Sequence, residues 1–147
     1  AQVTLPTVAE HARRVLEIAE RDDVDTVIVE GAGGLLVHLD GEGNTLADLG
    51  IALRDAGARA GFVLVVASRL GTLNVTALTA EALARRELDL IGYVVGSYPS
   101  EPDLAERTNI DDLPTAAGAQ PLGRIPTGAA SLEPAEFRTH ATEWVHL

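Results

Sequence analysis

Three short runs rich in Val, Ile and Leu constrain the fold of this chain more than any other feature of its sequence. They do not alternate apolar with polar residues, which is typical of strands in a parallel sheet covered on both faces. Each run is separated from the next by a stretch long enough for a helix, as crossovers between parallel strands require. The runs are residues 26–29, 62–67 and 90–95, and a weaker fourth strand is expected at 120–125.

The stretches around these runs carry helical patterns. We therefore predict an α/β fold in which a parallel sheet has helices on both faces and the first three strands are neighbours. The length of 147 residues fits a single α/β domain over 1–147. In such a sheet, ligands bind at the carboxyl ends of the strands. The helices are expected at 7–21, 46–58, 74–86, 104–117 and 134–145.

Composition excludes several classes of function. Without cysteine, the chain has no disulfides, thiolate metal sites or cysteine nucleophiles. A net charge of -11 disfavours binding to nucleic acid, because that binding depends on neutralising phosphates. The apolar runs are far shorter than the ~20 residues that a membrane span needs. No signal-like leader opens the chain, and we expect a cytoplasmic protein. Its histidines show no metal-binding spacing such as HExxH, and its eleven basic residues are all arginine.

The sharpest local signal is a glycine-rich turn that follows the first apolar run and a carboxylate. Three glycines in four positions, Gly31, Gly33 and Gly34, indicate positive φ angles or a close approach to a ligand. Backbone N–H groups in such a turn can hold phosphates, and Glu30 is placed to bind Mg²⁺. By spacing alone, a tight turn whose glutamate caps a helix explains the pattern equally well.

Three further segments follow predicted strand ends. Residues 67–74 lead from a strand into a helix, and N–H groups at a helix start bind anions, although capping by Thr72 or Asn74 is the simpler interpretation. Residues 92–99 and 124–128, with Glu133 downstream, end strands at the same edge of the sheet. Each of these two is, in isolation, an ordinary turn.

Taken together and in this order, the segments resemble the dethiobiotin synthetase family of P-loop enzymes. The elements that carry the resemblance are Glu-Gly-Ala-Gly-Gly at 30–34, Thr-Leu-Ala-Asp at 45–48, Leu-Gly-Thr-Leu-Asn at 70–74, Gly-Tyr-Val-Val at 92–95 and Ile-Pro at 125–126. The first element is shared with related P-loop families. Its combination with the later ones is considerably more specific.

The resemblance implies an ATP-dependent cyclo-ligase of biotin synthesis. CO₂ would add to 7,8-diaminononanoate as a carbamate, a nucleoside triphosphate such as ATP would phosphorylate it, and ring closure would give the cyclic urea. The family's residues then imply Glu30 as a Mg²⁺ ligand and a homodimer with a shared active site. The expected nucleotide-binding residues are Glu30, Gly31, Ala32, Gly33, Gly96, Ser97, Pro126, Thr127, Gly128 and Glu133, and the expected substrate-binding residues are Leu70, Gly71, Thr72, Leu73 and Asn74.

The chain departs from the family pattern in two ways. The family opens with a GxxxxGK[ST] phosphate loop and uses a further catalytic lysine, whereas this sequence contains no lysine. We therefore expect the chain to be the C-terminal portion of such a protein, P-loop NTPase-like in fold, incomplete at the N-terminus and without the catalytic residues. At Gly96 the family commonly has an asparagine that contacts the base, so base preference stays open.

Two other functions remain possible at this point. A synthetase domain of the cobyrinate-amidating type shares the first element, but it is expected to continue into a glutamine-hydrolysing domain with a cysteine. A non-catalytic nucleotide-binding or dimerisation module could keep the sheet without the phosphate loop. The sequence preceding Ala1 would distinguish these alternatives.

Overall fold

A computed structural model of the chain describes residues 5–146, which cluster in two compact units. The first unit contains the chain up to Gly61 together with Arg86–Leu88, and the second contains Phe62–Arg85 and the chain from Asp89 onward. The expectation of a single domain over 1–147 stays a prediction. In the described part of the chain, no helix is long and apolar enough to cross a bilayer.

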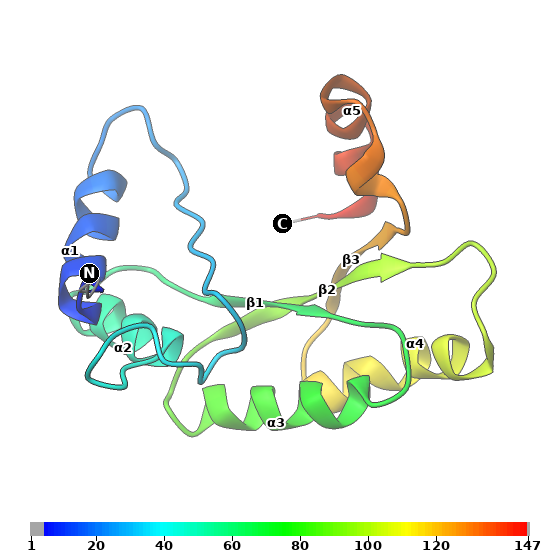
Figure 1. Cartoon of the computed structure of the whole chain (residues 1–147), viewed down its shortest axis with the longest axis horizontal. Coiled ribbons are helices and arrows are strands. Elements are labelled where there is room, and N and C mark those ends of the chain that lie inside the picture. The colour runs from blue at the N-terminus through cyan, green and yellow to red at the C-terminus, as the bar shows by residue number, and fades with distance from the viewer. Residues whose placement is uncertain (1–4, 147) are drawn as a thin grey trace, which may run out of the picture. The chain divides into compact units, whose positions relative to one another are not determined.

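The second unit contains a parallel sheet of three strands, in the order β1-β2-β3 (Figure 1). The strands are β1 (Phe62–Val66), β2 (Leu90–Tyr98) and β3 (Pro121–Pro126). In the central register, Val65 pairs with Val94 of β2, and Val94 pairs with Gly123 of β3. The prediction of a parallel α/β sheet is confirmed for the runs at 62–67, 90–95 and 120–125.

Helices α3 (Thr72–Ala84) and α4 (Leu104–Ala117) connect these strands and lie together on one side of the sheet (Figure 1). The core of this unit is built from apolar residues of the strands and of α4. After β3, a short 3₁₀ turn, η1 (Ala129–Ser131), leads into α5 (Pro134–Trp144). The buried core residues are Val66, Tyr93, Val95, Leu113 and Ala117.

Burial of β1 differs from the sequence expectation. Its residues are all apolar, which predicted coverage on both faces, but Val63 is 36% and Val65 75% exposed. Leu64 and Val66, which point to the opposite face, pack in or against the core. The apolar run therefore predicted the strand correctly and overestimated how much of it is covered.

The first unit contains α1 (Val8–Ala19) and α2 (Leu46–Asp55). One apolar stripe from each helix forms a small core of Val8, Ala12, Leu49 and Leu53. The helix starts are stabilised by their own sequence. Thr7 and Glu10 form a capping box on α1, and the Asp48 carboxylate accepts hydrogen bonds from the backbone N–H and the hydroxyl of Thr45, each at 2.7 Å.

The predicted strand at 26–29 is wrong. These residues are extended but form no strand, and Ile28 is 83% and Val29 39% exposed. An extended segment becomes a strand only when its N–H and C=O groups pair with a neighbour. Within residues 5–146 no strand pairs with this segment, so Val27 is not a strand neighbour of Val63 and Val94.

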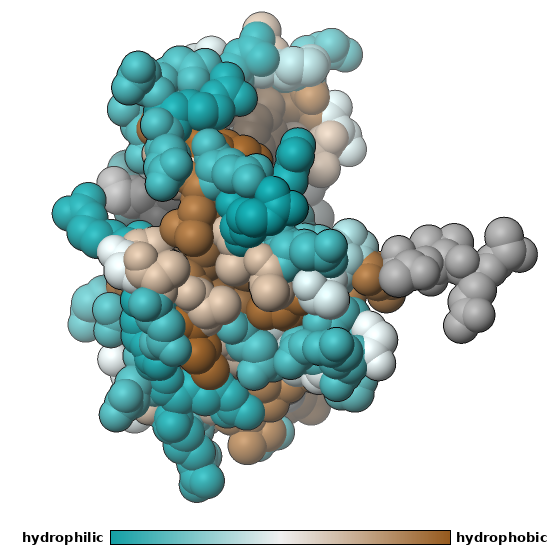
Figure 2. All heavy atoms as spheres, turned by 90° about the vertical axis from the view of Figure 1, so that its left-hand side faces the viewer, coloured by the Kyte–Doolittle hydropathy of each residue, from teal (hydrophilic) through white to brown (hydrophobic). Residues whose placement is uncertain are grey.

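Large apolar side chains of the first unit reach the surface. Figure 2 shows apolar patches between hydrophilic residues on the face of the molecule that is turned to the viewer. Exposed apolar area of this kind costs free energy in water, at roughly 25 cal/mol per Å² relative to burial. Besides Ile28 and Val29, the exposed large apolar residues of this unit are Leu5, Leu36 and Val37.

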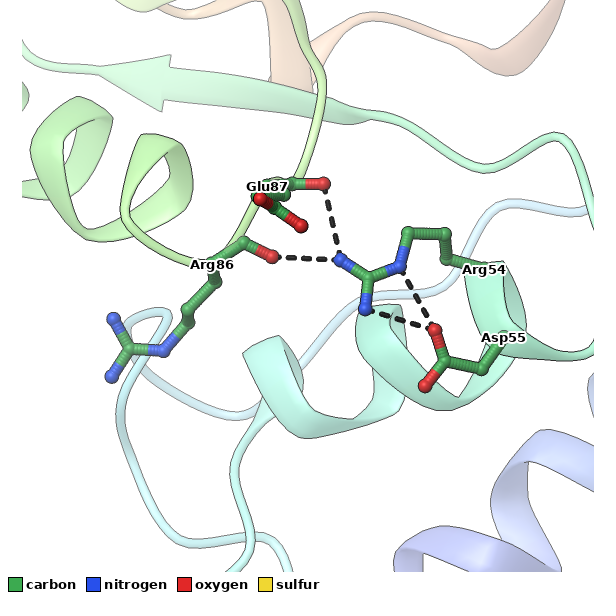
Figure 3. A network of polar contacts seen from close by, with 4 residues as sticks. All are labelled: Arg54, Asp55, Arg86 and Glu87. Atoms are coloured by element: carbon green, nitrogen blue, oxygen red, sulfur yellow. Dashed lines mark hydrogen bonds and ion pairs between the residues drawn. The ribbon is translucent and has the colours of Figure 1, made fainter.

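Arg54 joins α2 to the segment Arg86–Leu88 of the same unit (Figure 3). Its Nη1 donates to the carbonyl oxygens of Arg86 at 2.8 Å and Glu87 at 3.3 Å, while its Nε and Nη2 donate to the Asp55 carboxylate. Glu87 has a φ of 55°, which costs a non-glycine residue about 1–2 kcal/mol. The guanidinium therefore stabilises a backbone conformation that the sequence does not favour locally.

A buried carboxylate holds the start of α1. Asp40 is 6% exposed and accepts hydrogen bonds from four donors at 2.8–3.1 Å. These bonds favour the charged form and lower the pKa of Asp40 from 3.8 to about 2, although burial opposes the shift. The donors are, in order of effect, the Asn44 side chain and the backbone N–H groups of Asn44, Val8 and Glu42.

We predict that Asp40→Asn lowers the melting temperature at neutral pH. The melting temperature of the variant should also fall less than that of the wild type as the pH is lowered. A carboxyl with a lowered pKa contributes stability above its unfolded-state pKa of 3.8 and loses it as the pH falls through about 2. The wild-type chain should therefore lose more stability than the variant between these pH values. Thermal unfolding followed by circular dichroism checks this, with the exposed Asp22→Asn as control. Equal pH profiles for wild type and Asp40→Asn would contradict it.

Candidate nucleotide and substrate site

The Glu30 loop in the first unit combines an exposed carboxylate with closely packed glycines. A Cβ on Gly31 would lie 3.3 Å from Leu46 Cδ2, at the start of α2. Gly33 has a φ of 108°, and its Cβ would lie 3.0 Å from Val37 Cγ2. Packing and backbone geometry thus account for these two glycines, while Glu30, Ala32 and Gly34 remain exposed.

Glu30 is not part of a ready-made cluster of metal-binding side chains. Among residues 5–146, no group of three or more His, Asp or Glu side chains is arranged to hold a metal ion. A cation at Glu30 would therefore need most of its ligands from water or phosphate. Mg²⁺ binds in this way, typically through one or two carboxylates, several waters and substrate phosphates. The donor set fits Mg²⁺ bound together with a nucleotide.

The start of α3 in the second unit has no capping side chain. Gly71 is the N-cap, with a φ of 96°, and no neighbouring atom lies within 4 Å of the position that its Cβ would take. Glycine is needed here for its backbone conformation. Of the five residues predicted to bind substrate, Leu70, Gly71 and Asn74 are exposed, Thr72 is buried, and Leu73 packs against the core.

The ends of β2 and β3 bring two predicted segments together. The hydroxyls of Ser97 and Thr127 are 2.8 Å apart, and the Thr127 N–H donates to the Tyr98 carbonyl oxygen at 2.9 Å. Gly96 permits a close strand contact, since its Cβ would lie 2.6 Å from Val65 Cγ1. Parallel pairing of β2 with β3 therefore joins the residues around Ser97 and Thr127 that were singled out separately in the sequence.

A shallow cavity of about 460 Å³, open to solvent, lies at these strand ends. The Arg124 guanidinium sits 4.6 Å from the centre of the Tyr98 ring, so a cation–π contact forms part of its wall. Pro126 and Thr127 line the cavity, and their role in nucleotide binding stays a prediction. Gly128 follows them with a φ of 90°, and Glu133 is the exposed N-cap of α5. The remaining lining residues are Pro99, Ser100 and Trp144.

Tyr98 and Arg124 lie in segments that the sequence analysis singled out but were given no role there, and Trp144 was missed altogether. Trp144 comes from the last turn of α5, and it is the single tryptophan of a chain with only 3% aromatic residues. That scarcity was an available signal, because tryptophan is often placed where one ring face meets a ligand or partner. The Trp144 ring packs against Phe137, at 5.5 Å between centroids, and stacks on His140 at 5.8 Å.

Comparison with protein families matches residues 5–135 to an AAA domain. The chain belongs to this family. It is also similar to proteins named ATP-dependent dethiobiotin synthetase BioD from Streptomyces and Saccharopolyspora species, which confirms the resemblance inferred from the sequence motifs. The first unit contains Glu30–Gly33. The second unit contains Leu70–Asn74 and the residues that line the cavity. Their assembly into one site stays a prediction.

The similarity extends over most of the chain. The Streptomyces coelicolor protein is 54% identical over 121 residues, which cover 82% of this chain and 49% of that protein. The Streptomyces avermitilis protein is 51% identical, covering 96% of this chain and 57% of that protein. The Saccharopolyspora erythraea protein is 57% identical, covering 77% and 47%. The chain thus spans about half the length of the curated relatives it matches.

We predict that Gly123→Ala detaches the end of α5 from β3. A Cβ on Gly123 would lie 1.9 Å from the Trp144 carbonyl oxygen and 2.7 Å from Val145 Cα, so backbone would have to move. Overpacking of this kind costs about 1–3 kcal/mol, and Trp144 should become more exposed. Trp144 fluorescence should shift to longer wavelength, and chemical unfolding should show lower stability.

The control is Gly41→Ala, because no atom lies within 4 Å of the Cβ that it adds and the residue does not have a left-handed backbone. This control should leave both the emission and the unfolding free energy close to wild type. If Gly123→Ala behaves like the control, the close contact between β3 and the end of α5 is not present in solution.

Proposed function

We propose that this chain supplies nucleotide- and substrate-binding parts of an ATP-dependent dethiobiotin synthetase that acts in the cytoplasm. The reaction joins CO₂ and 7,8-diaminononanoate into a cyclic urea at the expense of a nucleoside triphosphate. The observation that carries the proposal is the hydrogen bond between Ser97 and Thr127, a residue that lines the cavity, in a chain 51–54% identical to two proteins of that name.

The cavity at the ends of β2 and β3 is assigned to the nucleoside. Its wall offers an aromatic ring at Tyr98, a flat guanidinium at Arg124 and an indole at Trp144. Planar groups of this kind favour a stacked heteroaromatic base. Ser97 and Thr127 supply hydroxyl groups beside it. Gly96 adds no side chain, so this position does not select a particular base.

Phosphate binding is assigned to the loop at Gly31–Gly33. A chain with a net charge of -11 repels a polyphosphate unless local groups compensate. Backbone N–H groups in a glycine-rich turn provide such compensation without a charged side chain. Glu30 would hold Mg²⁺ beside the phosphates. When bound, this ion neutralises phosphate charge during transfer.

The start of α3 is assigned to the carboxylate of diaminononanoate. Gly71 leaves the first turn without a capping side chain, and helix N-termini attract anions. The same helix exposes Val75 at 62% and Leu78 at 57%, and Leu70 just before it is 86% exposed. An exposed apolar face next to the substrate position fits a homodimer in which each active site uses both chains.

We expect the complete protein to form dethiobiotin from diaminononanoate, bicarbonate, ATP and Mg²⁺, and Glu30→Gln to lower kcat by about 10²-fold. Glutamine keeps the volume of the side chain but removes the anionic ligand, so folding should survive. Product formation followed by mass spectrometry over a Mg²⁺ titration measures this, with the exposed Glu17→Gln as control. An inactive wild-type protein would refute the function, and an unchanged Mg²⁺ response would refute only the role of Glu30.

We also expect activity to return when two inactive variants are mixed. If Glu30 and Gly71 of one site come from different chains, a Glu30→Gln chain paired with a Gly71→Phe chain forms one intact site. Both defects then fall in the other site of the heterodimer. A one-to-one mixture should recover about a quarter of wild-type activity. Heterodimers that are verified by native mass spectrometry and remain inactive would exclude the shared site.

A further inference from the structure

A buried polar cluster connects the end of β1 to α4. Ser68 is 4% and Asn109 7% exposed. The Ser68 hydroxyl donates to Glu106 Oε1 at 3.0 Å and lies 3.5 Å from the Ser97 carbonyl oxygen. The Asn109 side-chain amide donates to the Ser68 carbonyl oxygen at 2.8 Å. Two residues of α4 therefore hold both the side chain and the backbone of Ser68.

The acceptor in this cluster is itself fixed. The second carboxylate oxygen of Glu106 accepts the Asp103 N–H at 3.0 Å, and Asp103 Oδ1 accepts the Glu106 N–H at 2.8 Å. This capping box at the start of α4 restricts the glutamate to one orientation. The position of Ser68 is thereby set by a helix start rather than by a freely rotating side chain.

Buried polar groups stabilise this part of the core less than apolar groups would. Each buried hydroxyl or amide must be desolvated, and its hydrogen bonds return only about 0.5–1.5 kcal/mol net. A fully satisfied buried network contributes rigidity and a unique geometry more than stability. Such a network is expected where a backbone segment has to be held in place for binding.

The backbone that follows Ser68 leads directly to the predicted substrate position. The Thr72 N–H donates to the Arg69 carbonyl oxygen at 3.2 Å, which closes the turn before α3. Gly71 in this turn has a left-handed backbone, and Leu73 of α3 packs against the core. Only two residues, Arg69 and Leu70, separate Ser68 from Gly71, so a shift at Ser68 moves the first N–H groups of α3.

We propose that Glu106 and Asn109 are positioning residues for the start of α3. Acting through Ser68, they fix the loop that presents Gly71–Asn74 to the substrate carboxylate. The identity of that ligand rests on the proposed function, whereas the connection from α4 to the loop rests on the contacts described above. Neither residue needs to touch the substrate.

The decisive variant is Asn109→Asp in the complete protein. Aspartate has almost the same size, but its carboxylate cannot donate to the Ser68 carbonyl oxygen. The KM for diaminononanoate should rise about tenfold, while the KM for ATP and kcat stay within about twofold. Ser68→Ala should change the same KM in the same direction. Asp112→Asn, the reverse exchange on an exposed position of α4, should change none of these constants.

The division between KM and kcat separates positioning from a merely structural role. Loss of folded protein lowers the concentration of active enzyme and therefore the apparent kcat, but it leaves the KM of the remaining enzyme unchanged. Glu106→Gln gives a second test, because glutamine keeps an acceptor for the Ser68 hydroxyl. Its KM for diaminononanoate should lie nearer to wild type than that of Glu106→Ala. An unchanged KM in Asn109→Asp would overturn the proposal.

Hydrogen exchange tests the connection without any assay of activity. In Asn109→Asp, the amides of residues 69–74 should exchange at least about tenfold faster than in wild type. Amides of α5 provide the internal reference and should be unaffected. If the wild-type protein makes no dethiobiotin, the proposed function fails and exchange alone decides the positioning role. Unchanged exchange at 69–74 would overturn it.

Discussion

The structure of the second unit depends on β2, the strand that pairs with both of its neighbours. Its parallel pairing with β1 and β3 brings all three carboxyl ends to one edge. Because of that pairing, the hydroxyls of Ser97 and Thr127 form a hydrogen bond, and the Ser68 hydroxyl lies 3.5 Å from the Ser97 carbonyl oxygen. Loss of β2 pairing would separate the cavity from the start of α3.

Much of this fold could be predicted because the relevant signals are local. Apolar runs gave the strands at 62–66, 90–98 and 121–126, and helix patterns gave α4 and α5 to within one residue. The run at 26–29 carries the same signal and forms no strand, because pairing depends on a neighbouring segment and not on the run itself. The left-handed backbone of Glu87 was equally hidden, since it depends on hydrogen bonds from the distant Arg54.

The candidate site likewise combines residues that local sequence signals pointed to with residues that only the fold brings in. The family resemblance implied Gly96, Ser97, Pro126 and Thr127 as binding residues, and the structure brings the hydroxyl groups of Ser97 and Thr127 together. Their role in binding stays a prediction. Arg124 opens one of the segments singled out in the sequence, but its contact with the Tyr98 ring depends on the pairing of two strands. Trp144 could not be found in this way, because it reaches the cavity through an antiparallel bridge between Gly123 and Val145 that no local pattern encodes.

The charge of the chain bears on how the proposed site could bind an anion. With twice as many carboxylates as basic side chains, long-range electrostatics oppose any polyanion, so affinity has to arise at short range. Oriented N–H groups act at hydrogen-bond distance, and their strength depends on how well they are held. A binding group built from backbone cannot adjust by rotating a side chain, as a lysine can. On the proposed function, rigid support of the kind that Asn109 gives to Ser68 would let an acidic chain hold a carboxylate at a helix start.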